Sequence, residues 1–141
     1  YYEYLQMKGL YNPSYVFKGK FTSEDGYALM KEALAKKVLP TAFFIASDSM
    51  AIGALRALHE GGIRVPEDMS VVGFNDIATS KFLHPSLTTV KVHTEFMGET
   101  GVGLLLERLE TDRAISKKVV VPTVLVPRES SQVKEAAAKN Y

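Results

Sequence analysis

Residues 40–77 read PTAFFIASDSMAIGALRALHEGGIRVPEDMSVVGFNDI, with two short apolar runs on either side of an amphipathic segment. The runs Ala42–Ala46 and Ser70–Phe74 are unbroken, which is typical of strands that are buried on both faces. Between them, apolar residues recur at helical spacing over Met50–Leu58 and predict a helix that ends at Gly61. A strand, a helix and a strand with short connections predict a βαβ unit in a parallel sheet.

The chain on either side of this unit continues the alternation of helices and strands. Helical spacing, capping residues and β-branched runs locate these elements. They place the fold in the α/β class, a parallel sheet flanked by helices. A proline in the last extended segment predicts a sheet edge or a crossing between sheets. The expected helices are 1–8, 22–37 and 95–110, with a helical turn at 80–83, and the expected strands or extended segments are 15–17, 88–92 and 119–126.

The composition excludes several classes of protein. The chain has 141 residues and no cysteine, which excludes a disulfide framework, a thiol nucleophile and cysteine-ligated metal sites. With 17 Lys and Arg against 16 Asp and Glu, the net charge of +1 gives no overall attraction for nucleic acid. No apolar run approaches the roughly 18 residues of a membrane-spanning helix, so we expect a cytoplasmic protein without membrane contact. Since the chain begins at Tyr1, we also expect it to be a fragment.

Neither a metal site nor an enzyme active site is indicated. The three histidines, His59, His84 and His93, do not have the spacing of metal ligands. The serines form no recognisable nucleophile motif, and no glycine-rich phosphate loop is present. We therefore expect no metal, no cofactor and no catalytic activity.

Polar pairs follow the two apolar strands of the βαβ unit. Ser47 and Asp48 come after the first strand, and Asn75 and Asp76 come after the second. Because ligands bind beyond the carboxyl ends of parallel strands, we expect both pairs on one rim, with the aromatic ring of Phe21 beside them. Such a set fits a polyol ligand. The alternatives are that Asp48 only caps the next helix, that the second pair only forms a turn, and that Phe21 is a core residue.

Beyond these patterns, the segment from Pro40 to Ile77 resembles the effector-binding core of the LacI/GalR family of bacterial repressors. The shared pattern is a P-[TS]-A start, an apolar strand, an Asn-Asp or Ser-Asp pair before Met-Ala, a helix, and a close variant of GhxVPxDhSVhGFDD, where h is apolar. Two further pieces agree, HPSLTTV at 84–90 and VPTVLVPRESS at 121–131. The resemblance covers nearly the whole chain up to Ser131, and the combination of motifs is specific although no single one is.

The resemblance implies a type I periplasmic-binding-protein-like fold, in which two lobes hold a small effector between them. Residues 1–87 would form the C-terminal effector-binding lobe without its beginning, and residues 88–121 would belong to the N-terminal lobe. Residues 122–131 would return to the C-terminal lobe, and residues 132–141 would be a tail, native or appended. The helix at 95–110 would then lack partners for its apolar face, so we expect exchange between two chains or local disorder.

The resemblance also implies roles for individual residues. Two of them, Ser47 and Asn75, differ from the residues common in the family. Members dimerise through the C-terminal lobe, and the alternative for the apolar residues assigned to that interface is that they pack inside the lobe. The implied effector-binding residues are Phe21, Ser47, Asp48, Asn75, Asp76 and Thr94, and the implied dimer interface is Ile52, Leu55, Phe82 and Leu83.

We therefore interpret the chain as part of the effector-binding and dimerisation domain of a sugar-responsive transcriptional repressor. Its partners would be a small-molecule effector, a sugar in the first instance, and a second copy of the chain. Operator DNA would be bound only by a separate helix-turn-helix domain. The alternative is a transport-associated, periplasmic-type sugar-binding protein with the same fold. The closing VPRESS stretch favours the repressor, and a purine or phosphosugar effector stays open.

Overall fold

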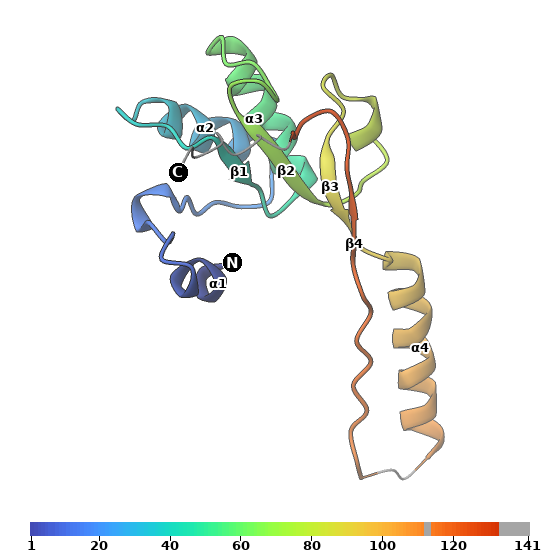
Figure 1. Ribbon diagram of the computed structural model, residues 1–141. Helices are drawn as coiled ribbons and strands as arrows, with labels where there is room; N and C mark the ends of the chain where they lie inside the picture. The colour runs from blue at the N-terminus through green and yellow to red at the C-terminus, as the bar shows by residue number, and fades with distance from the viewer. Residues whose placement is uncertain (112–113, 133–141) are drawn as a thin grey trace, which may run out of the picture.

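The computed structural model describes residues 1–111 and 114–132, which form a four-stranded sheet with the order β1-β2-β3-β4 (Figure 1). The first three strands run parallel, and β4 is antiparallel to β3 at the far edge. The predicted parallel βαβ unit is confirmed, and one antiparallel strand extends it. The strands are β1 Ala42–Phe44, β2 Ser70–Asn75, β3 Thr88–Lys91 and β4 Val124–Val126.

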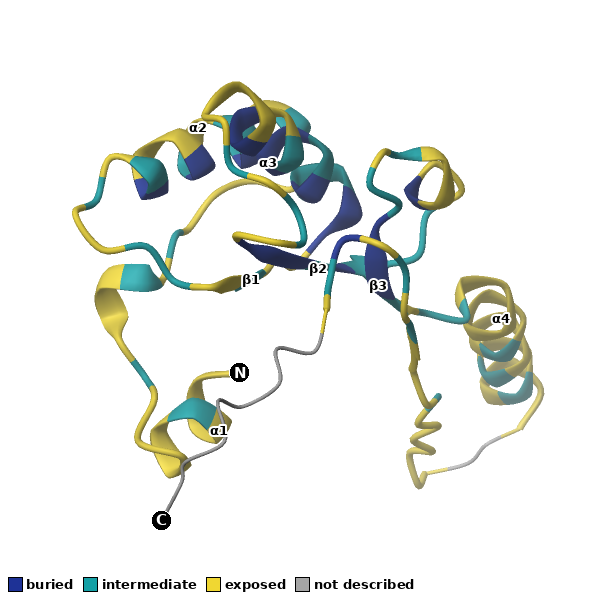
Figure 2. Cartoon of the chain, turned by 45° about the horizontal axis from the view of Figure 1, so that its top comes forward, coloured by how far each residue is buried: buried dark blue, intermediate teal, exposed yellow. Residues whose placement is uncertain are grey.

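Two helices, α2 and α3, cover one face of this sheet, and α1 lies on the side of the opposite face (Figure 2). The helices expected from the sequence are confirmed, with small differences at their ends. Of the tail expected at 132–141, residues 133–141 lie outside the described residues. The helices are α1 Tyr2–Met7, α2 Ser23–Leu34, α3 Asp48–Glu60 and α4 Thr94–Glu110, with 3₁₀ turns at Pro13–Tyr15 and Ser80–Phe82.

Helices α2 and α3 touch through their backbones. A Cβ atom on Gly53 of α3 would lie 1.8 Å from the carbonyl oxygen of Ser23, and one on Gly26 of α2 would lie 2.0 Å from that of Met50. Both distances are far shorter than any real contact, so only glycine allows the helices to approach this closely. The Ser23 hydroxyl also donates to the carbonyl of Ser49 at 2.8 Å. The amino ends of α2 and α3 are therefore held side by side.

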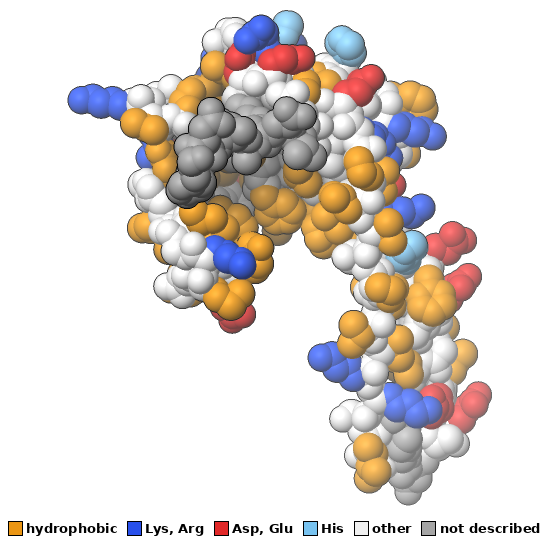
Figure 3. Space-filling view, viewed as in Figure 1, with side chains coloured by type: hydrophobic (Ala, Val, Ile, Leu, Met, Phe, Trp, Pro, Cys, Tyr) orange, Lys and Arg blue, Asp and Glu red, His pale blue; other side chains and the backbone are white. Residues whose placement is uncertain are grey.

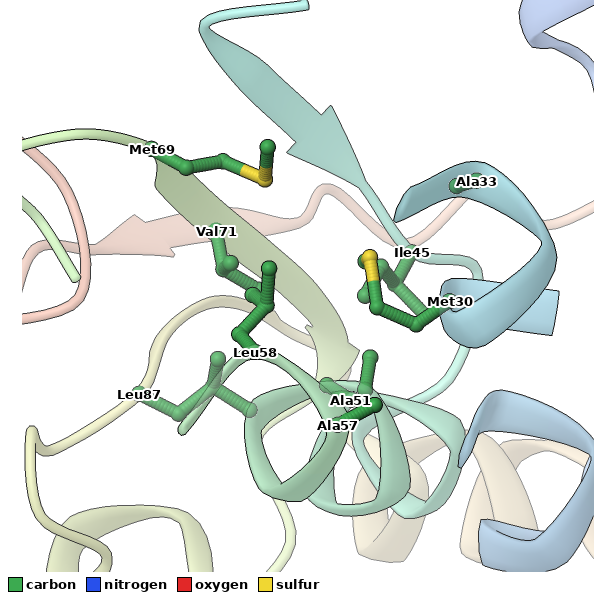
Figure 4. Close-up of a cluster of buried hydrophobic side chains, with 10 residues drawn as sticks. Met30, Ala33, Ile45, Ala51, Ala57, Leu58, Met69, Val71 and Leu87 are labelled. Atoms are coloured by element: carbon green, nitrogen blue, oxygen red, sulfur yellow. The ribbon is translucent and has the colours of Figure 1, made fainter. Parts of the chain in front are cut away.

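The hydrophobic core lies between these two helices and the sheet (Figure 4). Its inner side chains are small on the helical side, which agrees with the close approach of α2 to α3. Fully buried Leu58, Val71 and Leu87 join α3 to β2 and to the residue before β3. The buried hydrophobic residues are Met30, Ala33, Ile45, Ala51, Ala54, Ala57, Leu58, Met69, Val71 and Leu87.

Two expectations about the strands are wrong. The strand expected at 15–17 does not form: Tyr15 ends a 3₁₀ turn, and no strand pairs with this segment among the described residues. The first apolar run is not buried on both faces, because α2 and α3 cover only one of them. Phe44, on the uncovered face of β1, is 47% exposed, with the rings of Tyr1 and Phe74 each 6.3 Å away. The continuous apolar run at 42–46 is therefore not evidence that both faces of β1 are buried.

The part of the chain after β3 projects from the sheet as an arm, made of α4 and the segment 114–123 (Figure 1). An ion pair between Lys117 and Glu107 ties the two pieces together. No residue of α4 is buried, and its exposed apolar side chains appear along the arm in Figure 3. The glycines of α4, Gly98, Gly101 and Gly103, face open space, since a Cβ atom on any of them would meet no neighbouring atom within 4 Å.

The lobe boundary expected at residue 88 stays a prediction, and residue 88 begins a strand of the sheet. Thr88–Lys91 is β3, which pairs with β2 in the same sheet, so the arm begins at Thr94. Of the extended segment expected at 119–126, only Val124–Val126 forms a strand, and it lies at the sheet edge as its proline predicted. Within the described ranges, no helix combines the length and the apolarity that crossing a membrane requires.

The glycines at the contact between α2 and α3 and the glycines of α4 should respond differently to substitution by alanine. We expect Gly53→Ala to lower the free energy of unfolding by about 1–3 kcal/mol, because the new methyl group overlaps the Ser23 carbonyl. Gly98→Ala is the matched control, since it faces open space in α4 and alanine favours a helix by about 1 kcal/mol over glycine. Urea unfolding followed by circular dichroism measures both. Equal effects of the two substitutions would contradict the close backbone contact.

Candidate functional site

Four chain segments meet at the carboxyl-end rim of the sheet. The loops after β1 and β2 are joined directly, because the Ile77 backbone N–H donates to Asp48 Oδ2 at 2.9 Å. The loop after β3 reaches the same place, since the Val92 N–H donates to the carbonyl of Asn75 at 3.4 Å. The bond from Ser23 to Ser49 brings the loop before α2 to this edge as well. The expectation that the polar pairs share one rim is confirmed.

Asp48 is fully buried at the centre of this rim. Its Oδ1 accepts from Thr89 Oγ1 of β3 at 2.6 Å, and its Oδ2 accepts from Ser80 Oγ at 2.8 Å and from the Ile77 N–H. The carboxylate crosses β2 where a Cβ on Gly73 would lie 2.2 Å from Oδ1. A buried charge needs such partners, and the amino end of α3 favours it further.

The interpretation of Asp48 as an effector-facing residue is therefore wrong. Its carboxylate is inaccessible to solvent and is shared among three donors of the chain itself. The alternative of a helix cap captures only the location of Asp48 in the first turn of α3, and misses the contacts that tie that helix to two other segments. Asp48 acts as a fixed anchor that sets the positions of the side chains around it.

Two side chains of the rim are left for a ligand. Ser47 is 5% exposed, and its hydroxyl makes no capping bond to α3. Asn75 is half-buried at the end of β2. Across the described part of the chain, neither side chain has a hydrogen bond to another residue. Because buried polar groups normally find partners, this pair is the feature of the rim that calls for a ligand.

The turn after β2 has an unusual backbone. Asn75 has a φ of +116° and Asp76 a φ of +59°, in a region that side-chain-bearing residues rarely adopt. Such a conformation costs about 1–3 kcal/mol per residue and persists only where neighbouring contacts impose it. Asn and Asp tolerate it better than most residues, and here Asn75 is the last residue of β2 while Asp76 follows it, so the alternative of turn residues holds at most for Asp76.

The carboxylate of Asp76 is also occupied. Arg128 Nη2 donates to Asp76 Oδ1 at 2.6 Å, with the two side chains 17% and 14% exposed, and Arg128 Nη1 donates to the carbonyl of Leu87 at 2.8 Å. Arg128 thus holds one oxygen of Asp76, and the effector-binding role of Asp76 stays a prediction. Sequence reasoning gave Arg128 no role, because the only signal was its place in the VPRESS motif, 52 residues beyond its partner.

The segment that carries Arg128 is anchored beside β2 and β3. Fully buried Ser130 accepts from the N–H of Thr88 at 2.8 Å and donates to the carbonyl of Val71 at 2.7 Å. The carboxylate of Glu129 accepts from the Ser86 N–H at 2.8 Å, and this bond is the main reason why the pKa of Glu129 lies below its ordinary value. Arg128 therefore starts from a rigid position.

Phe21 and Thr94 are the remaining expected site residues, and both are exposed. Phe21 is 69% exposed, so the alternative that it belongs to the core is wrong. Thr94 is the exposed first residue of α4, and its N–H donates to the carbonyl of Val92 at 3.0 Å. The structure thus leaves the Phe21 ring and the Thr94 side chain accessible on segments that adjoin Ser47 and Asn75.

An apolar groove of about 260 Å³ lies elsewhere, between α2, β1 and residues 15–17. Its walls include Phe17, Met30 and Phe43, and none of the six expected site residues lines it. Among the described residues, no three His, Asp or Glu side chains are grouped so that they could hold a metal ion. The polar rim is therefore the candidate site.

The four residues expected at a dimer interface differ in how far they are exposed. Leu55 and Leu83 pack against the core, so the alternative of internal packing holds for them in part. Ile52 is half-buried on α3. Phe82 is 77% exposed, and the ammonium group of Lys81 lies 4.9 Å from the centre of its ring. Phe82 is thus the most accessible apolar side chain of the four.

Known proteins resemble this chain over most of its length. Residues 1–131 match the family described as a periplasmic binding protein-like domain. Over 118 residues the chain is 52% identical to the HTH-type transcriptional repressor MelR of Bacillus subtilis (strain 168), which covers 84% of this chain and 34% of that protein.

Two solved structures have a similar fold. The transcriptional regulator CelR–cellobiose complex gives a TM-score of 0.86 at 38% identity, covering 92% of this chain and 40% of that one. The lac repressor dimer bound to operator and the anti-inducer ONPF gives 0.85 at 33% identity, covering 93% and 45%. The chain therefore spans less than half of the length of each of these three proteins.

Substitutions of Asp48 test its anchoring role. We expect Asp48→Ala to lower the free energy of unfolding by about 3 kcal/mol or more, since three buried donors lose their acceptor, and Asp48→Asn to cost about 1–3 kcal/mol. Asp68→Asn makes the same chemical change in a partly exposed side chain and should have the smallest effect. Urea unfolding measures the three variants, and any other order of stabilities contradicts the assignment.

Proposed function

The chain belongs to the periplasmic binding protein-like domain family, among the LacI/GalR-type regulators, and on that premise we propose that it is the effector-binding part of a sugar-responsive transcriptional repressor. The observation that carries the proposal is the pair Ser47 and Asn75. Their side chains, without hydrogen bonds in the described structure, lie at a rim whose neighbouring carboxylates are both occupied. The rim is thus prepared for a ligand that supplies several hydroxyl groups.

The chemistry of these side chains fits a sugar. The Asn75 amide offers one acceptor and two donors, and the Ser47 hydroxyl can donate or accept, so both can pair with vicinal hydroxyl groups. The exposed Phe21 ring gives an apolar surface for the C–H face of a sugar, and Thr94 adds a second hydroxyl from the start of α4. Asp48 and Asp76 hold these groups in place through their contacts within the chain.

The relatives support the same function. CelR was solved with cellobiose, and the lac repressor was solved as a dimer on operator DNA. By analogy, the effector of this protein would favour one arrangement of the lobes over another and so change the operator affinity of paired DNA-binding heads. The effector and a second copy of the chain are the partners of this domain, and operator DNA is the partner of a helix-turn-helix domain. The protein acts in the cytoplasm and catalyses no reaction.

The proposed organisation follows the sheet. Residues 1–91 form one lobe, residues 94–121 extend into the other lobe, and residues 122–131 return to the first. The exposed apolar face of α4 is consistent with an arm that packs against a second lobe or a second chain.

A transport-associated sugar-binding protein with the same fold is the second candidate. It would use the same rim residues, and the distinction lies in operator binding. The similarity to MelR, a transcriptional repressor, favours the regulator.

Sugar binding is the direct test of the proposal. We expect cellobiose, galactose or melibiose to raise the thermal unfolding midpoint of the full-length protein, since a ligand that binds only the folded state stabilises it. Asn75→Ala should weaken the binding of that sugar by about tenfold, roughly the loss of one hydrogen bond. Asn12→Ala, at an exposed turn cap, is the matched control and should bind as wild type does. A protein that responds to none of the three sugars would contradict the proposal.

The dimer interface has its own test. We expect the full-length protein to have the mass of a dimer by light scattering, and Phe82→Glu to shift it to a monomer, because a carboxylate would be buried at the contact. Val38→Glu places the same charge on another exposed apolar position and should leave the dimer intact. A dimer that survives Phe82→Glu contradicts the assignment of this surface.

A further inference from the structure

We infer that Arg128 is a positioning residue for the effector site: by pairing with Asp76 it holds the turn that directs Asn75 toward the ligand. The role of Asn75 in binding rests on the proposed function. The geometry of the turn does not depend on it, so the two can be tested separately. Nothing in the sequence pattern alone assigns Arg128 to the site.

The side chain of Arg128 joins two separate parts of the chain. One arm of its guanidinium group donates to Asp76 Oδ1 at 2.6 Å, and the other donates to the carbonyl of Leu87 at 2.8 Å. The exposed fractions of the two charged side chains, 17% and 14%, leave little room for solvent to screen the pair. Arg128 thus links the turn to the start of β3, a fixed part of the sheet.

The backbone conformation of the turn after β2 must be stabilised by contacts with other segments. Asn75 and Asp76 both have positive φ, and no glycine relieves either position. The Ile77 N–H is fixed by Asp48 on one side, and the Asp76 carboxylate is fixed by Arg128 on the other. Asn75 is the last residue of β2, paired with Lys91 of β3, and it directly precedes these two anchors. Its unpartnered amide therefore has a direction that both anchors set, and only one of them, Asp48, belongs to the βαβ unit.

Arg128 lies on the segment that follows β4 and is also bonded to β3 through its backbone. Its N–H donates to Thr88 Oγ1 at 2.8 Å, and the Thr88 hydroxyl lies 3.0 Å from its carbonyl oxygen. It follows β4, the strand through which the arm returns to the sheet. A shift of this returning strand would thus move Arg128, then Asp76, then Asn75. The direction of Asn75 is in this way coupled to the segment that connects the sheet with the arm.

Only arginine has the shape to pair with Asp76 and Leu87 together. A guanidinium group offers donors in a rigid planar fork, so it can pair with a carboxylate and a carbonyl in two directions at once. A lysine ammonium keeps the charge and has a single nitrogen. Arg128→Lys therefore keeps the attraction to Asp76 and removes the bridge to Leu87, which separates charge from geometry.

The experiment measures binding and turn geometry in the same variants. In the full-length protein, Arg128→Lys and Asp76→Asn should each weaken the binding of the responding sugar among cellobiose, galactose and melibiose by about tenfold, measured by titration calorimetry. The double variant should lose little more than either single one, because both act through one contact. Backbone amide NMR signals of residues 75–77 should shift in both variants, while those of α2 stay in place.

A matched control separates positioning from general destabilisation. Glu129→Gln changes the adjacent residue, whose carboxylate binds Ser86 and does not touch the turn. It should change the thermal midpoint without changing sugar affinity or the signals of residues 75–77. A purely structural role for Arg128 predicts that both variants lower the midpoint alike and leave affinity unchanged.

The outcomes are distinct. If the wild type binds a sugar and Arg128→Lys binds it with the same affinity, the inference is overturned and the proposed function stands. A wild type that binds no sugar overturns the proposed function, and the inference about the turn is then decided by the amide signals alone. Unshifted signals of residues 75–77 in Arg128→Lys overturn the inference in either case.

Discussion

The buried carboxylate of Asp48 is the interaction on which the rest of the structure depends. It lies in the first turn of the helix between β1 and β2, crosses β2 at Gly73, and receives hydrogen bonds from Thr89 on β3 and from the loop after β2. A charge in this position cannot be solvated, so it is stable only while every one of these segments stays in place. One side chain thereby fixes the register of three strand ends and the edge at which polar groups gather.

Glycine sets a second constraint, which acts on the same edge. The backbones of α2 and α3 touch at Gly26 and Gly53, and this contact brings the loop before α2 next to the loop after β1. That loop carries Phe21, whose ring is 69% exposed.

Local sequence patterns predicted the elements well and the exposure of their faces less well. The strands at 42–44 and 70–75 follow from their apolar runs, and the helix over 48–60 follows from residue periodicity and from the glycines after it, which act over a few residues. The apolar run at 42–46 was read as buried on both faces, yet Phe44 is 47% exposed. The same side chains suit a covered and an uncovered strand face, and only the placement of the neighbouring helices distinguishes the two.

By itself, the sequence determined the βαβ alternation and the gathering of polar residues at one rim, because strands and the polar residues that end them are encoded by adjacent residues. The tertiary structure alone decided what each polar residue does. It turned the Asp48 carboxylate inward and gave Asp76 to Arg128, 52 residues away, leaving Ser47 and Asn75 for a ligand. These outcomes depend on which distant segments meet, and a local pattern of residues carries no record of such meetings.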